Sequence, residues 1–208
     1  MPKPKPRFTN TDFHTAFVEE WTPDNLECVR GFKCNLHEFA SHFSKRVPRD
    51  VDASLSRCWV VVENGHLAGF VTLMAATFVK YGSDDATKLQ LLLDEGVEYT
   101  TFPAIKIGLL AADSRAKGAG KRLVEWAIEY VATDLALRVG ARFLVVDAAY
   151  DAHRTPHYDI SSFYGKFGFE FATEGAKLPP VMPYRTMYLD LKPMIESMRS
   201  SIVARSGR

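Results

Sequence analysis

The sequence predicts an α/β protein, because strand-like apolar runs alternate with helical patterns along the second half of the chain. Residues 105–112 form an apolar run, and residues 118–139 form a long amphipathic segment that closes at Gly140. A second apolar run at 143–148 leads, after a loop, to a short segment that ends at Gly168. Two strand–helix units in succession favour a sheet that contains parallel strands.

The first half of the chain predicts an antiparallel hairpin preceded by a helix. Asn64-Gly65 lies between the strand-like runs 59–63 and 67–78, and this dipeptide is typical of a two-residue hairpin turn. Residues 31–47 carry apolar side chains at helical spacing. These side chains are Phe32, Leu36, Phe39, Phe43 and Val47.

Shorter elements complete the expected order. We expect a first strand at 13–21, a short helix at 83–93 capped near Ser83, a last strand at 184–191 and a terminal helix at 193–203. The Pro/Lys alternation of residues 1–9 predicts a disordered, extended tail.

The composition fits one globular domain. A chain of 208 residues with 47% hydrophobic residues can bury a substantial core. The net charge of +1 argues against nucleic-acid binding by overall charge alone, although it is compatible with a local basic patch. Cys28, Cys34 and Cys58 are odd in number and form no Cys-x-x-Cys pair, which predicts reduced thiols. With no signal peptide and no membrane-spanning run, we expect a cytoplasmic protein that does not enter a membrane.

A glycine turn, residues 115–120, separates the first apolar run from the long helical segment. Residues 115–122 read Arg-Ala-Lys-Gly-Ala-Gly-Lys-Arg. Free N–H groups and the positive end of a helix dipole make such a turn suited to binding phosphate. A Walker-type loop would need Gly at Arg115 and Ser or Thr at Arg122, and a dinucleotide loop would need Gly at Leu123. Neither pattern is met, and an ordinary glycine turn before a helix stays open.

The remaining pattern is basic-x-x-Gly-x-Gly, with Arg115, Gly118 and Gly120 at its fixed positions. It resembles the acyl-CoA diphosphate loop of the GNAT acetyltransferase superfamily. A second GNAT-like signature, Tyr-x-x-x-Gly-Phe, follows the second apolar run with Tyr164 and Gly168. Gly168 would supply the positive φ that often ends a helix. The two motifs occur in the family's order, and the resemblance covers roughly residues 10–192.

The resemblance implies a GNAT fold over residues 10–192, with a helix or tail at 193–208. In that fold a mixed central sheet has helices on both faces, and two parallel strands splay apart to bind acyl-CoA. The strand end would pair with the pantetheine arm and the glycine turn would hold the diphosphate. The residues implied are Leu110, Ala111, Ala112, Arg115, Lys117, Gly118, Ala119, Gly120, Lys121 and Arg122.

The chemistry implied is direct transfer of an acetyl group from acetyl-CoA to a primary amine. Tyr164 would serve as the general acid at the sulfur, because a phenol with a pKa of about 10 is protonated at neutral pH. The alternative is a core tyrosine whose hydroxyl binds the backbone. Asp113 and Asp147 are candidate general bases, but Asp113 could instead cap the glycine turn and Asp147 could bind groups at its strand end. No metal is expected, since the His153-x-x-x-His157 pair lacks a third ligand and contains Pro156.

The acceptor stays open at this stage. Residues 31–39 and 102–108 resemble the GNAT-type toxins of toxin–antitoxin pairs, which acetylate aminoacyl-tRNA and bind a ribbon-helix-helix antitoxin. The alternatives are a transferase for a small or protein amine and a non-catalytic CoA-binding module. A homodimer is compatible with the sequence. Basic residues that could face tRNA are Arg30, Lys33, Lys45, Arg46, Arg49 and Arg57.

Overall fold

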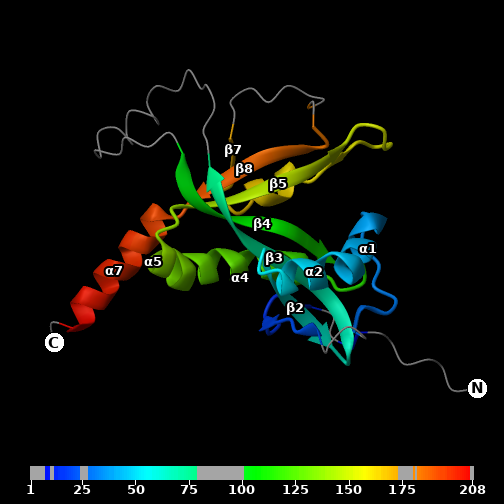
Figure 1. Cartoon of the computed structure of the whole chain (residues 1–208), viewed down its shortest axis with the longest axis horizontal. Helices are drawn as coiled ribbons and strands as arrows, with labels where there is room; N and C mark the ends of the chain where they lie inside the picture. The colour runs from blue at the N-terminus through cyan, green and yellow to red at the C-terminus, as the bar shows by residue number, and fades with distance from the viewer. Residues whose placement is uncertain are drawn as a thin grey trace, which may run out of the picture. The chain divides into compact units, whose positions relative to one another are not determined.

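The chain folds around a mixed β-sheet (Figure 1). The computed structural model describes residues 8–9, 12–23, 28–78, 101–172, 180 and 182–206. These residues fall into two compact units. The first unit comprises Met1–Met74 and Ile107–Tyr130, and the second comprises Ala75–Lys106 and Val131–Arg208. The predicted helix at 83–93 lies outside the described residues, as does most of the predicted tail at 1–9.

The strands of the first unit run in the order β1, β2, β3, β4. They are β1 (Glu19–Glu20), β2 (Arg57–Glu63), β3 (His66–Phe78) and β4 (Phe102–Ala112), and the last two also extend into the second unit. β2 and β3 pair antiparallel around Asn64 (φ 51°) and Gly65 (φ 73°). Two successive positive φ angles fit a type I′ turn, so the predicted hairpin is confirmed.

The predicted first strand, 13–21, is mostly wrong. Only Glu19 and Glu20 pair with β2. The backbone N–H of Phe13 instead donates to the carbonyl of Lys117 at 3.1 Å, and the Phe13 side chain is buried. A contact distant in sequence therefore decides the local conformation here.

The predicted helix at 31–47 starts later and divides in two, α1 (His37–Lys45) and α2 (Val47–Asp52). Pro48 fits the division, because it lacks the N–H that would continue α1 and is tolerated in the first turn of α2. Phe43 and Val47 nevertheless enter one core cluster with Val60 and Phe70, as the helical spacing predicts.

Helices α1 and α2 pack on one face of this part of the sheet, and helix α4 (Ala119–Tyr130) packs on the other face. Trp59 contacts Trp126 and Tyr130 of α4, whereas its neighbour Val60 packs in the cluster that contains α1 and α2. Successive strand residues point to opposite faces, so helices lie on both sides, as predicted. A Cβ at Gly69 would lie 2.8 Å from Leu123, which shows how closely α4 approaches β3.

The second stretch of the second unit, Val131–Arg208, begins with the end of the same long helical segment. A π-helical turn, η2 (Val131–Leu135), leads into α5 (Ala136–Val139), so the predicted single helix at 118–139 contains one irregular turn. Gly140 ends it at φ 70°, as expected. The remaining elements are β5 (Phe143–Asp151), β6 (Tyr158–Asp159), α6 (Ser161–Gly165), β7 (Glu170–Phe171), β8 (Tyr184–Asp190) and α7 (Lys192–Ser206).

The strands of the second unit run in the order β4, β5, β8, β7, with β6 beside β5. β4 and β5 are parallel, and β8 runs antiparallel to both β5 and β7. Phe78, Phe102, Phe143 and Tyr188 form its aromatic core, with ring centroids 4.7 to 5.8 Å apart. Within the described residues, no helix has the length and apolar character needed to cross a bilayer.

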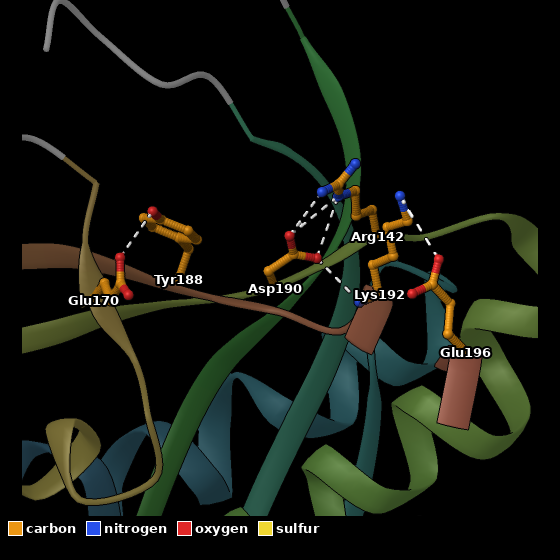
Figure 2. Close-up of polar contacts among 6 residues, drawn as sticks. All are labelled: Arg142, Glu170, Tyr188, Asp190, Lys192 and Glu196. Atoms are coloured by element: carbon orange, nitrogen blue, oxygen red, sulfur yellow. Dashed lines mark hydrogen bonds and ion pairs between the residues drawn. The ribbon is translucent and has the colours of Figure 1, made fainter. Parts of the chain in front are cut away.

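Asp190 anchors the start of α7 (Figure 2). Its carboxylate accepts the backbone N–H of Lys192 at 3.0 Å and pairs with Arg142 Nη2 at 2.8 Å. Arg142 in turn presents its carbonyl to the N–H of Leu191 at 2.9 Å. The predicted terminal helix therefore begins where a carboxylate binds its first N–H.

Candidate functional site: a glycine turn and a buried tyrosine

The first part of the candidate site is the glycine turn between β4 and α4. The turn needs glycine at position 118, where φ is +91°. A Cβ there would also lie 3.0 Å from His14 Nδ1 and 3.2 Å from Asp12 Oδ1. Gly118 therefore serves both the backbone conformation and the close approach of the N-terminal segment.

Asp113 organises the residues that lead into the turn. Its side chain is fully buried. One carboxylate oxygen accepts the backbone N–H and Nε of Arg115 at 3.0 and 2.7 Å, and the other accepts the N–H of Lys33 and Nη2 of Arg115 at 3.0 and 2.7 Å. Burial alone would raise the pKa of Asp113, but the hydrogen bonds from Arg115 and Lys33 hold it below its ordinary value. A carboxylate held ionised by four hydrogen bonds is a poor general base, so the capping alternative describes Asp113 better.

Arg115 connects the turn to the loop around residues 31–33 through side-chain hydrogen bonds. Besides its bonds to Asp113, its Nη2 donates to the carbonyl of Gly31 at 2.7 Å. The N–H of Ser114 donates to the carbonyl of Lys33 at 2.7 Å. The loop around residues 31–33 and the turn therefore form one hydrogen-bonded structure. No local sequence pattern indicates this link, because the two segments are about 80 positions apart.

The backbone N–H groups of residues 115–122 divide into two sets. Those of Arg115, Ala116, Ala119 and Arg122 donate within the turn and the first helical turn. Those of Lys117, Gly118, Gly120 and Lys121 have no partner among the described residues. These are orphan donors of the kind that every helix N-terminus leaves for a ligand, a side chain or water.

The N-terminal segment packs along one side of the turn. Phe13 donates its N–H to Lys117, and Arg122 Nε donates to the carbonyl of Ala16 at 2.9 Å. The side chains of His14 and Asp12 bind each other beside Gly118. Arg122 therefore has a structural contact of its own, while Lys121 lies 3.5 Å from Glu125 on the exposed face of α4.

The strand positions predicted to meet pantetheine lie at the end of β4. Leu110 and Ala112 are half-buried, whereas Ala111 is buried in the core cluster. Just before them, Thr72 Oγ1 accepts the N–H of Leu109 at 2.8 Å.

The candidate residue of the second unit, described by itself, is Tyr164 on α6. Its ring is buried against Phe163 and Phe169. Burial, with a smaller effect of Tyr158, raises the pKa of the Tyr164 phenol above its ordinary value, so the group is protonated at neutral pH. Gly168 has φ +86° and ends this segment, as the Tyr-x-x-x-Gly-Phe spacing predicts.

The other candidate residues lie in ordinary polar contacts. Asp147, the second candidate base, pairs with Lys106 at 2.5 Å and accepts from Thr186 Oγ1 at 2.8 Å. His157 Nδ1 lies 2.8 Å from the carbonyl of Ala152. Of the basic residues considered for tRNA, Arg46 pairs with Asp50 at 3.2 Å and Arg57 with Glu20 at 3.7 Å.

The mixed sheet has a parallel β4–β5 pair, and the turn and helix α4 lie between these two strands in the chain, which is the arrangement of the GNAT fold. Solved structures with this fold include a tyrosine-to-phenylalanine mutant of KacT, with a TM-score of 0.67 and 20% identity over 88% of this chain and 98% of that chain. AtaT complexed with acetyl-methionyl-tRNAfMet has a TM-score of 0.65 and 20% identity over 86% and 96% of the two chains. AtaTR bound with AcCoA has a TM-score of 0.62 and 21% identity over 88% and 96%.

These similarities are structural. No protein-family model matches the chain, and no curated protein matches it in sequence. The predicted fold class is therefore confirmed by structural similarity to solved proteins and not by a sequence match.

Proposed function

We propose that this protein is an acetyl-CoA-dependent N-acetyltransferase that moves the acetyl group directly to a primary amine. The observation that carries this proposal is the set of orphan N–H groups at Lys117, Gly118, Gly120 and Lys121. Backbone donors at a helix N-terminus suit a diphosphate, since they combine hydrogen bonding with the positive end of the helix dipole. Solved structures of the same fold contain AcCoA.

The residues of the glycine turn would bind acetyl-CoA, and Tyr164 would transfer a proton. Asp113 and Arg115 hold the turn in shape, and the orphan donors bind the diphosphate. Bound acetyl-CoA would supply the acyl group as a thioester: the amine nitrogen bonds to the carbonyl carbon, the carbon–sulfur bond breaks, and the proton that the nitrogen loses passes to water. Tyr164, which burial keeps protonated at neutral pH, would donate its proton or a hydrogen bond to the departing sulfur. Tyrosine-to-phenylalanine mutants of both KacT and AtaT exist as solved structures.

A second, narrower candidate function is a toxin that acetylates the amino group of aminoacyl-tRNA. It is favoured by the fold likeness to AtaT, which is a toxin and has been solved with acetyl-methionyl-tRNAfMet and with the C-terminus of the antitoxin AtaR. For this chain, the partner would be a charged tRNA and, for neutralisation, an antitoxin of the ribbon-helix-helix type. A non-catalytic CoA-binding module is the remaining alternative.

Thiol release from acetyl-CoA separates these functions. The assay compares small primary amines, a peptide N-terminus, aminoacyl-tRNA and the same tRNA without its amino acid. We expect release with an amine and none with uncharged tRNA. Release with aminoacyl-tRNA alone, together with growth arrest on expression, would identify the toxin. Acetyl-CoA binding without thiol release for any acceptor would contradict the enzyme proposal and leave the binding module.

A further inference from the structure

The helix that carries Tyr164 is too short to be stable on its own. Helix α6 spans Ser161–Gly165, only 5 residues, and a helix of this length is unstable without outside contacts. Its C-terminal end is fixed by Gly168, whose N–H donates to Gly165 at 3.1 Å. The orientation of Tyr164 therefore depends on what fixes the N-terminal end.

Asp159 fixes that end. Its Oδ1 accepts the N–H of Ser161, the first residue of α6, at 2.8 Å, while its Oδ2 pairs with Arg185 Nη1 at 3.1 Å. Ile160, the residue between, has no side chain able to cap a helix. Partial burial on its own would raise the pKa of Asp159, but hydrogen bonds from Ser161 and Arg185 hold it below its ordinary value.

Arg185 is itself held in place on two sides. Its side chain is 10% exposed, and its guanidinium lies 3.8 Å from the centre of the Phe171 ring. Its Nε is buried with no hydrogen-bond partner among the described residues, which is a cost of keeping a guanidinium in this position. The charge of Asp159 offsets part of that cost, since a buried cation needs a partner.

We infer that Asp159 and Arg185 are positioning residues for Tyr164, which set the orientation of its helix through the N–H of Ser161. The inference rests on the proposed function. The connection runs from Phe171 on β7 to Arg185 on β8, then to Asp159 on β6 and to α6, all within the second unit. Neither Asp159 nor Arg185 has to touch the reacting atoms for this role.

Asp190 provides a matched control, because it has the same two contacts at a different helix. It accepts the first N–H of α7 and pairs with Arg142 (Figure 2). Asp159→Asn and Asp190→Asn each remove one ionised carboxylate while leaving an acceptor for the helix N–H. A purely structural role of Asp159 predicts similar effects of the two substitutions on activity.

The experiment measures kcat, KM for acetyl-CoA and Tm for Asp159→Asn and Asp190→Asn, each alone and combined with Tyr164→Phe. Misplacing a reacting group by about 1 Å costs up to about 100-fold in rate. We expect Asp159→Asn to lower kcat about 10- to 100-fold with KM for acetyl-CoA nearly unchanged, and Asp190→Asn to leave kcat unchanged. In the Tyr164→Phe background, Asp159→Asn should cause no further loss, because the group it positions is gone.

Three results would overturn the inference: an unchanged kcat in Asp159→Asn, an equal loss in Asp190→Asn, or losses that multiply in the double variant. Arg185→Lys checks the other end of the connection and should lower kcat as well, since lysine keeps the charge but cannot stack and bind as a planar group. Failure of the proposed function looks different, because the wild-type protein would then release no thiol from acetyl-CoA with any acceptor.

Discussion

At the scale of single residues, the same type of side chain serves different purposes in this protein. Asp113, Asp159 and Asp190 each accept a backbone N–H and pair with an arginine, but they do so at the glycine turn, at the helix that carries Tyr164 and at the terminal helix, respectively. From sequence, Asp113 stays ambiguous between a base and a cap, because its role depends on Lys33, which lies far away in the chain. Tyr164 could be picked out by its spacing from Gly168, but its burial against Phe163 and Phe169 could not.

Tyr164→Phe tests the role of the phenol. The substitution removes only a proton donor, so turnover should fall about 100-fold or more while the Kd for acetyl-CoA changes little. Tyr188→Phe is the matched control, because Tyr188 is a buried tyrosine whose hydroxyl donates to Glu170 at 3.1 Å. Thiol-release kinetics and calorimetric titration of acetyl-CoA measure both quantities. Equal turnover in wild type and Tyr164→Phe would assign the tyrosine a packing role.

At the scale of elements, local signals predicted the turns better than the lengths of helices and strands. Asn64-Gly65, Gly140 and Gly168 all have the positive φ that their positions suggested. The break between α1 and α2 could have been predicted from Pro48, whereas no sequence feature indicates the π-helical turn at Val131–Leu135. Elements that depend on distant partners, such as the segment around Phe13, differ most from the prediction.

Gly118→Ala tests the conformation of the glycine turn. Alanine at φ +91° is strained by about 1–3 kcal/mol, and its Cβ would press on His14. Gly140→Ala is the matched control, with φ +70° and nothing within 4 Å of the added Cβ. Both variants should have a lower Tm, but only Gly118→Ala should bind acetyl-CoA roughly tenfold or more weakly. Equal binding by the two variants would place the diphosphate elsewhere.

Gly120→Glu tests the charge of the ligand at the same turn. A carboxylate beside the orphan donors competes with the diphosphate and repels it, so acetyl-CoA binding should be lost. Gly120→Gln has nearly the same size without the charge and should retain more of the affinity. If glutamate and glutamine weaken binding equally, the effect is steric and the electrostatic argument fails.

At the scale of the whole molecule, the sequence predicted the class of fold and the order of its main elements, but not the long-range polar contacts that shape the candidate site. Periodicity and turn residues act locally, which is why the hairpin and the strand–turn–helix could be predicted. The Asp113–Lys33 and Asp159–Arg185 contacts join segments 80 and 26 positions apart, and nothing in the local pattern pairs them.

Those contacts predict how stability depends on pH. The pKa values of Asp113 and Asp159 lie below the ordinary value of 3.8, so the folded state binds fewer protons than the unfolded state near that pH. Their contribution is fully present above about pH 5 and is lost as pH falls through 3.8 toward the lower folded pKa values.

Urea unfolding from pH 7 to pH 3 measures this dependence. Asp113→Asn should lower the free energy of unfolding at pH 7 by about 1–3 kcal/mol and make it less dependent on pH in the acid range. An unchanged acid dependence in the variant would show that Asp113 is not held ionised by its partners.

The central claim is that the orphan N–H groups of the glycine turn bind the diphosphate of acetyl-CoA and that the thioester then reaches Tyr164. The structure of the protein in complex with acetyl-CoA tests it most directly. We predict the diphosphate within hydrogen-bonding distance of the N–H groups of Lys117, Gly118, Gly120 and Lys121, and the sulfur beside the Tyr164 hydroxyl. A diphosphate bound away from these N–H groups, or a Tyr164 hydroxyl turned away from the sulfur, would contradict the account.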